Sequence, residues 1–161
     1  MVYNLGSYVI EINMRTIYIA SDHAGFKLKE EMRHFLVGEG YSIADLGPNR
    51  EAPNDDYPDF IRPVAEHVAR EEGAVGVVFG GSGEGEAIAA NRVSGVRAVV
   101  WYGKNDRIIT LSREHNDANI LAIGARFVDT EEAKRAIKLW LETPFSHEPR
   151  HQRRIDKIDN S

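Results

Sequence analysis

The residues best able to do chemistry lie in one glycine-rich stretch, GGSGEGEAIAANR, which runs from Gly80 to Arg92. Its glycines let the backbone approach a ligand closely and adopt positive φ. The stretch leads into a run of small residues typical of a helix, and the free N–H groups and dipole of a helix N-terminus favour an anion. It also carries two carboxylates, Glu84 and Glu86, which would repel a phosphate.

Two nucleotide-binding motifs are incomplete in this stretch. A dinucleotide fingerprint aligned on Gly81 and Gly83 places Glu86 where the third glycine belongs, which argues against a dehydrogenase. The spacing from Gly80 to Gly85 fits a P-loop, but Glu86 replaces its lysine. A third interpretation makes Glu86 a base beside backbone N–H donors, which suits proton removal next to a carbonyl and stabilisation of the enediolate. This stretch alone supports about equally the alternative that Glu86 is an ordinary acid in the first turn of a helix.

Length, composition and charge limit the remaining classes. The 161 residues fit one domain, and the net charge of −5 argues against nucleic-acid binding, so an anionic ligand would need a local basic cluster. The absence of cysteine excludes disulfides and thiolate catalysis and fits a cytoplasmic protein. No apolar run reaches the ~20 residues of a membrane span, and we expect no signal peptide. We interpret residues 1–13 as an N-terminal extension or a non-native addition, and residues 14–161 as one domain with a helical tail.

Apolar periodicity predicts alternating strands and helices. Strands are expected at residues 16–21, 41–46, 74–79, 96–102 and 119–124. Helices are expected at residues 28–36, 59–72, from 84 onward, 106–115 and 130–141, and the polar tail 147–158 can form another. Pro63 argues for a later start of the second helix, and Thr130 is the expected N-cap of the fifth.

This alternation predicts an α/β fold with three layers, a five-stranded parallel Rossmann-like sheet with helices on both faces. Ligands of such sheets bind beyond the carboxyl ends of the strands. The residues expected there are Asp22 and His23 after the first strand, the stretch from Gly80 to Glu86 after the third, and Arg126 after the fifth.

Five stretches together resemble the type B ribose-5-phosphate isomerases of the ribose/galactose isomerase family. They are ASDHAGFKLKE, DDYPDF, GGSGEGEAIAANR, REHNDANILAIGAR and RHQRRID, in the family's order from about Thr16 to Asp156. The resemblance implies a homodimer, or a dimer of such dimers, whose active sites are shared between subunits. It also implies interconversion of an aldose phosphate and its ketose phosphate through an enediol, without a metal or organic cofactor.

The family has two forms of the catalytic base. One form uses a cysteine just after the third strand, where this chain has Gly80. The other uses a glutamate a few residues later, and Glu86 matches it. Glu84 has no role in the family and is expected to be a solvated loop residue. The enediolate oxygens would be held by Ser82, itself equally suited to a turn, and by the amides of the loop that contains Gly81, Gly83 and Gly85.

Two polar pairs match further roles in the family. Asp22 and His23 would contact the substrate near its hydroxyls and phosphate; without the resemblance, Asp22 would be interpreted as a helix N-cap. His115 would open the sugar ring by protonating its oxygen, and Asn116 would donate to the enediolate. The ordinary alternative for the second pair is a helix C-terminus, which is compatible with the functional role.

The phosphate would be bound by arginines. Arg126, Arg150 and Arg154 match the family's phosphate ligands, and His151 lies between two of them; Arg150 and Arg154 are four residues apart, so one helical face can present both. The alternative is a solvated basic tail. Tyr57, in the DYP turn, is expected to line the pocket.

Other functions remain open on the sequence. The same machinery suits isomerisation of galactose-6-phosphate, allose-6-phosphate or a tetrulose phosphate. A domain that senses a phosphorylated metabolite without turnover is a rival from another class, but it would have little use for Glu86, His115 and Asn116 together. A receiver domain is less favoured because Gly80 stands where it needs an aspartate.

Overall fold

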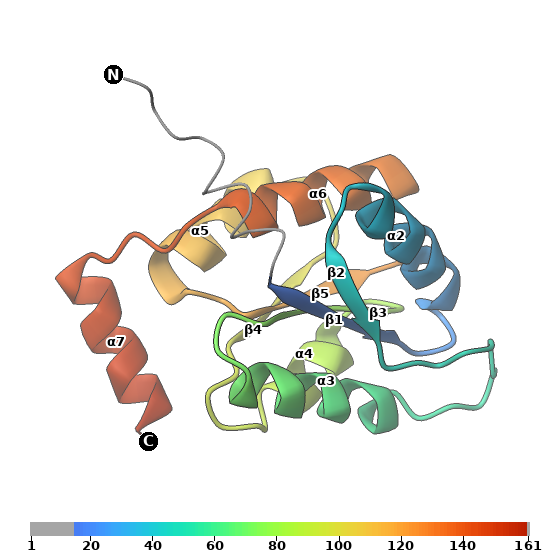
Figure 1. Cartoon of the computed structure of the whole chain (residues 1–161), viewed down its shortest axis with the longest axis horizontal. Helices are drawn as coiled ribbons and strands as arrows, with labels where there is room; N and C mark the ends of the chain where they lie inside the picture. The colour runs from blue at the N-terminus through green and yellow to red at the C-terminus, as the bar shows by residue number, and fades with distance from the viewer. Residues whose placement is uncertain (1–14, 161) are drawn as a thin grey trace.

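A computed structural model describes residues 15–160 of the chain (Figure 1). Its five strands form one parallel sheet in the order β2-β1-β3-β5-β4. The strands are β1 (Thr16–Ser21), β2 (Ser42–Asp45), β3 (Val75–Gly80), β4 (Ala98–Trp101) and β5 (Ile120–Gly124). The helices are α2 (Phe26–Gly38), α3 (Pro58–Arg70), α4 (Glu84–Ala90), α5 (Asp106–Asn116), α6 (Thr130–Glu142) and α7 (Pro149–Asp159). The predicted α/β class and parallel sheet are confirmed, while the predicted extension, residues 1–13, lies outside the described residues.

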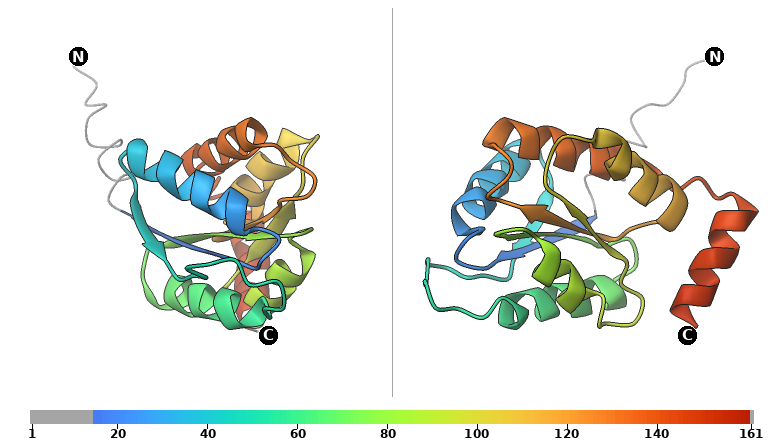
Figure 2. Two further views of the ribbon diagram at one scale, coloured as in Figure 1. Left: turned by 90° about the vertical axis from the view of Figure 1, so that its right-hand side faces the viewer. Right: turned by 180° about the vertical axis from the view of Figure 1, so that it is seen from behind.

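Helices cover both faces of the sheet (Figures 1 and 2). Helices α2, α5 and α6 pack over one face around a core that includes Met32, Leu121 and Trp140. Helices α3 and α4 cover the other face, where Ile61 and Val78 are fully buried. Strand β3 is buried along its whole length, which explains its continuous apolar sequence.

The order of the strands places a topological switch point between β1 and β3. After β1 the chain turns through α2 to β2 at one edge, whereas after β3 it turns through α4 to β4 at the opposite edge. The two connections diverge just beyond Ser21 and Gly80, the last residues of these strands. Such a switch point is the usual ligand position in an open α/β sheet.

Two details of the helices differ from the sequence prediction. Helix α3 starts at Pro58, and Pro63 lies inside it. Pro63 has no N–H to bond the carbonyl of Asp59, but Asp59 is exposed, so water can supply that bond. The N-cap of α6 is Asp129, in a capping box with Glu132, while Thr130 is the first helical residue and donates its hydroxyl hydrogen bond to Glu31. Within residues 15–160, no helix has the length and apolar character to cross a membrane.

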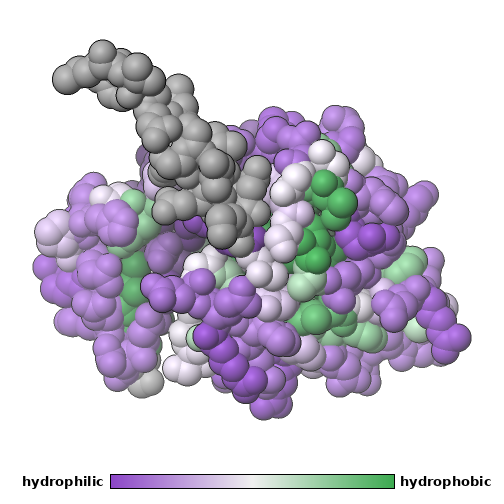
Figure 3. Space-filling view, viewed as in Figure 1, coloured by the Kyte–Doolittle hydropathy of each residue, from purple (hydrophilic) through white to green (hydrophobic). Residues whose placement is uncertain are grey.

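The C-terminal tail is a helix, and it lies apart from the layers. Helix α7 packs against α5, on the side away from the carboxyl ends of the strands (Figures 1 and 2). A narrow apolar band runs along the side of α7 that is turned toward the rest of the molecule (Figure 3). On this helix Ile155 is buried, at 5 % exposure, whereas Arg150 and Arg154 are exposed.

Candidate active site

Glu86 lies at the end of β3 with its carboxyl group folded back over Gly80. Helix α4 begins directly after Gly83, whose φ of +83° needs a glycine, and Glu86 stands in the first turn. The residue is only 3 % exposed. A Cβ atom at Gly80 would come within 2.1 Å of the Glu86 carboxyl group. The absence of a side chain at position 80 therefore makes the space that this carboxyl group occupies.

Burial gives Glu86 the properties of a base. It raises the pKa of the Glu86 carboxyl above the usual 4.5; a hydrogen bond to the residue's own backbone opposes the shift, and the charge of Asp22 adds to it. An ordinary first-turn acid points to solvent, as the exposed Glu84 does on the same turn. A buried carboxylate with a raised pKa, at a ligand-binding edge of the sheet, is suited to proton transfer.

Two side chains, those of Arg126 and Tyr57, pack on the glycine loop, and Ser82 lies within it. The backbone N–H of Arg126 donates to the Gly81 carbonyl at 3.2 Å, and its guanidinium lies against the same glycine. The Tyr57 ring packs so closely on Gly85 that a Cβ atom there would lie 2.7 Å from it. The Ser82 hydroxyl accepts from the Glu84 amide at 3.3 Å, which is the ordinary role of a serine in a turn, and Ser82 itself is exposed.

Asp22 and His23 face the loop from the end of β1. Asp22 is buried and accepts a hydrogen bond from the Gly25 amide at 2.8 Å. Because the N-cap of α2 is Gly25 itself, the interpretation of Asp22 as an N-cap is wrong. His23 is half-buried beside it. We define the carboxyl-end cluster as Asp22, His23, Tyr57, Gly81, Ser82, Gly83, Gly85, Glu86 and Arg126.

The other predicted residues gather at the amino ends of the strands. His115 and Asn116 are the last residues of α5, just before β5 begins. The His115 and His151 rings are 4.1 Å apart between centroids, so α7 brings its basic residues to the same place. We define the amino-end cluster as His115, Asn116, Arg150, His151 and Arg154.

Within this cluster, His151 is buried and the two arginines are exposed. His151 is only 2 % exposed, and its Nδ1 lies 2.9 Å from the Ser146 hydroxyl. Burial lowers the pKa of His151, and the neighbouring His115 and Arg150 lower it further. Arg150 pairs with Glu148 at 2.8 Å across an exposed surface. Arg150 and Arg154 are thus the cluster's accessible cations.

The two clusters lie at opposite ends of the sheet. Strand β5 separates them with five residues, which at ~3.3 Å each span roughly 16 Å. A five-carbon sugar phosphate is too short to contact Glu86 and His115 of one chain at the same time.

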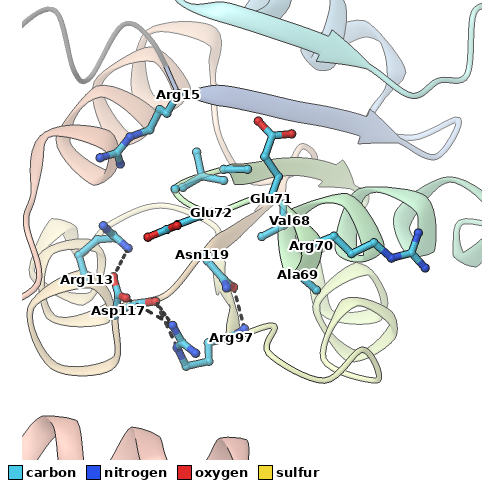
Figure 4. A pocket seen from close by; sticks show the side chains of 13 residues that line it. Arg15, Val68, Ala69, Arg70, Glu71, Glu72, Arg97, Arg113, Asp117 and Asn119 are labelled. Atoms are coloured by element: carbon cyan, nitrogen blue, oxygen red, sulfur yellow. Dashed lines mark hydrogen bonds and ion pairs between the residues drawn. The ribbon is translucent and has the colours of Figure 1, made fainter.

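A polar pocket lies at the amino ends of the strands, next to the amino-end cluster, and its side chains hold the end of α5 (Figure 4). Its volume is about 430 Å³. The Arg97 guanidinium donates to the carbonyl of Asn116 at 2.9 Å and to Asp159 at 2.9 Å, so it ties the end of α5 to the end of α7. Arg113 donates to Asp117 at 2.8 Å and to the Ala118 carbonyl. These guanidinium groups hold the turn that presents His115 and Asn116.

Sequence reasoning missed several residues near the carboxyl-end cluster. A cavity of about 740 Å³ beside Ser82 and Arg126 is also lined by Tyr102 and Phe127, whose rings are 5.9 Å apart. Tyr102 directly follows β4, so the rule that ligands bind beyond the strands could have identified it. Asp55, which bonds His23, lies in an irregular loop without a periodic signal.

Comparison with known proteins agrees with this geometry. The family described as Ribose/Galactose Isomerase matches residues 17–158. The chain belongs to the ribose/galactose isomerase family. It is 41% identical over 141 residues to a ribose-5-phosphate isomerase B of Mycolicibacterium paratuberculosis, which covers 87% of each protein. It is 38% identical to a putative sugar phosphate isomerase of Bacillus subtilis, covering 89% of this chain and 95% of that protein.

Solved structures within this family have the same fold. The ribose-5-phosphate isomerase B of Mycoplasma genitalium, crystallised with bound ribulose-5-phosphate, superposes with a TM-score of 0.86 at 38% identity, covering 91% of this chain and 95% of that one. The enzyme of Clostridium thermocellum gives 0.84 at 43% identity, covering 90% and 95%. The resemblance inferred from the five sequence stretches is confirmed.

Proposed function

We propose that the protein interconverts ribose-5-phosphate and ribulose-5-phosphate through a cis-enediolate. The observation that carries this proposal is the carboxyl group of Glu86, buried over Gly80 at the switch point between β1 and β3. Relatives named ribose-5-phosphate isomerase B support the choice of substrate. The cytoplasm stays the predicted location of the reaction.

Glu86 carries the proton in this reaction. Its ionised carboxylate removes the proton from C2 of the open-chain aldose, and the electron pair moves to the C1 carbonyl oxygen. The amides of the glycine loop and Ser82 stabilise the resulting oxyanion. A proton moves from the O2 hydroxyl to the O1 oxyanion, which transfers the negative charge to O2. The protonated Glu86 then returns its proton to C1 while the C2 carbonyl forms, which gives the ketose. Burial raises the pKa of Glu86 toward neutral pH, where one group can both accept and release a proton, and this favours both transfers.

A second copy of the chain completes the site. His115, Asn116 and the arginines of α7 lie at the end of the sheet opposite Glu86. We therefore infer a homodimer in which the amino-end cluster of one subunit faces the carboxyl-end cluster of its partner. There His115 would protonate the ring oxygen, Asn116 would donate to the enediolate, and Arg150 and Arg154 would bind the phosphate together with Arg126 of the first subunit.

Turnover of ribose-5-phosphate by Glu86→Gln tests the proposal. Glutamine keeps the size of the side chain and removes the base, so kcat should fall by about 10²–10⁴-fold while substrate binding stays within a few-fold. Glu84→Gln is the matched control, because Glu84 lies exposed on the same helical turn and should keep its activity.

Two results would contradict the proposal. Equal activity of Glu86→Gln and the unaltered protein would remove Glu86 as the base. If the unaltered protein does not turn over ribose-5-phosphate, the same assay with galactose-6-phosphate, allose-6-phosphate and a tetrulose phosphate identifies another isomerase. Binding without turnover of any of them would indicate a sensor.

A further inference from the structure

A buried carboxylate holds the histidine of the carboxyl-end cluster. Asp55 Oδ1 lies 2.7 Å from Nδ1 of His23 and also accepts from the His23 backbone N–H at 3.1 Å. The Asp55 side chain is only 5 % exposed, whereas that of His23 is 35 % exposed. One oxygen thus fixes both the backbone and the ring of His23. Because Nδ1 is occupied, Nε2 is the ring nitrogen left for a ligand.

The charges around His23 favour its protonated form. The hydrogen bond to Asp55 raises the pKa of His23; partial burial opposes this, Asp22 and Asp55 add to it through their charges, and Arg126 lowers it. The second oxygen of Asp55, Oδ2, is buried and has no hydrogen-bond partner within residues 15–160. A buried carboxylate needs a cation beside it, and His23 supplies one when protonated.

We propose that Asp55 is a positioning residue that holds His23 as an imidazolium with its Nε2–H available to the substrate's phosphate, next to Arg126. This inference rests on the proposed function. The negative charge of Asp55 allows two cations, His23 and Arg126, to face one ligand before the ligand arrives. The site then presents the single Nε2–H of the His23 imidazolium and the planar guanidinium of Arg126 to the same phosphate dianion.

Asp55→Asn separates the charge of Asp55 from its geometry. Asparagine Oδ1 can still accept from the His23 backbone N–H, so the loop stays tied to the end of β1. The imidazole loses its anionic partner, and the pKa of His23 should fall. Asp56→Asn is the matched control, because Asp56 is the exposed neighbour in the same loop.

The test combines an NMR titration of His23 in the free protein, binding of inorganic phosphate, and KM and kcat for ribose-5-phosphate across pH. Because His23 binds phosphate only when protonated, its contribution is present below its pKa and lost as pH rises through it. In Asp55→Asn this loss should begin at a lower pH. Above that pH, KM and the Kd of phosphate should rise about tenfold, with kcat within about twofold. At lower pH, the variant and the unaltered protein should converge.

A second variant keeps the inference falsifiable. His23→Gln should weaken phosphate binding at every pH at which the unaltered His23 is protonated, and adding Asp55→Asn should then change little. An unchanged pKa of His23 in Asp55→Asn would overturn the inference, and so would a loss of kcat at constant KM or a weakening that does not depend on pH. The NMR and phosphate measurements need no turnover, so they remain decisive even if the proposed isomerase activity fails.

Discussion

At the scale of single residues, one glycine decides which group can serve as the base. The carboxyl group of Glu86 occupies the space that a side chain at position 80 would fill. The family's cysteine form needs a side chain at this very position, so the two bases exclude each other in this geometry. In the proposed mechanism, Gly80 and Glu86 therefore act together, because the glycine leaves the space for the carboxyl group that serves as the base.

Gly80→Ala should abolish most of the activity without unfolding the protein. The added methyl group would lie 2.1 Å from the Glu86 carboxyl, which must move away from its place over β3. We expect kcat to fall by about 10²-fold or more, because small displacements of a catalytic group are costly. The assay is ribose-5-phosphate turnover, with a crystal structure of the variant to locate Glu86.

Gly38→Ala is the control for this substitution. At Gly38, the last residue of α2, a Cβ would meet no heavy atom within 4 Å beyond its chain neighbours and the backbone of its own helix, so activity should be kept. Full activity of Gly80→Ala, with Glu86 still in place, would refute the steric argument.

The sequence singles out Glu86 as the candidate base, but its surroundings could be predicted only in part. Glu86 interrupts two nucleotide-binding motifs, and this alone marks it as unusual among the residues of the glycine loop. Its burial could not be predicted, because an acid in a first turn points to solvent as readily as Glu84 does. The bond between Asp55 and His23 joins residues 32 positions apart through an irregular loop, and loops carry no periodicity from which such a contact follows.

At the scale of helices and strands, the sequence predicted every element within residues 15–160. The central strands β1, β3 and β5 were the clearest, because buried parallel strands are continuous apolar runs. The predicted start of a helix was wrong where a single residue sets it, as Pro58 does for α3 and Asp129 does for α6. The order of the strands in the sheet and the position of α7 could not be predicted from the apolar periodicity of the sequence. Those features follow from long-range packing, such as the contact between His115 and His151.

Arg97 is expected to control the placement of α7. It stands just before β4 and joins the carbonyl of Asn116 on α5 to Asp159 on α7. Arg97→Ala removes both hydrogen bonds. Because both bonds are solvent-exposed, water can replace the guanidinium, and the free energy of unfolding should fall by about 0.5–1.5 kcal/mol. Because α7 presents Arg150 and Arg154, KM for ribose-5-phosphate should rise several-fold more than kcat falls. Thermal unfolding and steady-state kinetics measure the two effects.

Arg107→Ala is the matched control for this brace. Arg107 lies on the exposed face of α5 and pairs with Glu114 at 3.5 Å, a surface contact worth little. It should change neither stability nor KM appreciably. If Arg97→Ala behaves like Arg107→Ala, Arg97 does not position the amino-end cluster.

At the scale of the whole molecule, the sheet separates the groups that the proposed reaction must bring together. Glu86 and Arg126 lie beyond its carboxyl ends, whereas His115 and the arginines of α7 lie at its amino ends. Within one chain these groups cannot serve the same sugar phosphate. The proposed homodimer would bring them together, because each of two chains related by a two-fold axis would place one end of its sheet against the other chain and form two equivalent sites.

Complementation between two inactive variants tests this arrangement most directly. Glu86→Gln disables the carboxyl-end cluster, and a double variant, His115→Ala with Arg154→Ala, disables the amino-end cluster. Co-expression with two different tags allows the mixed dimer to be purified. One of its two sites carries all the substitutions and the other carries none, so the mixed dimer should show about half of the unaltered activity. A mixed dimer as inactive as its parents, or a failure to form one, would contradict the shared site.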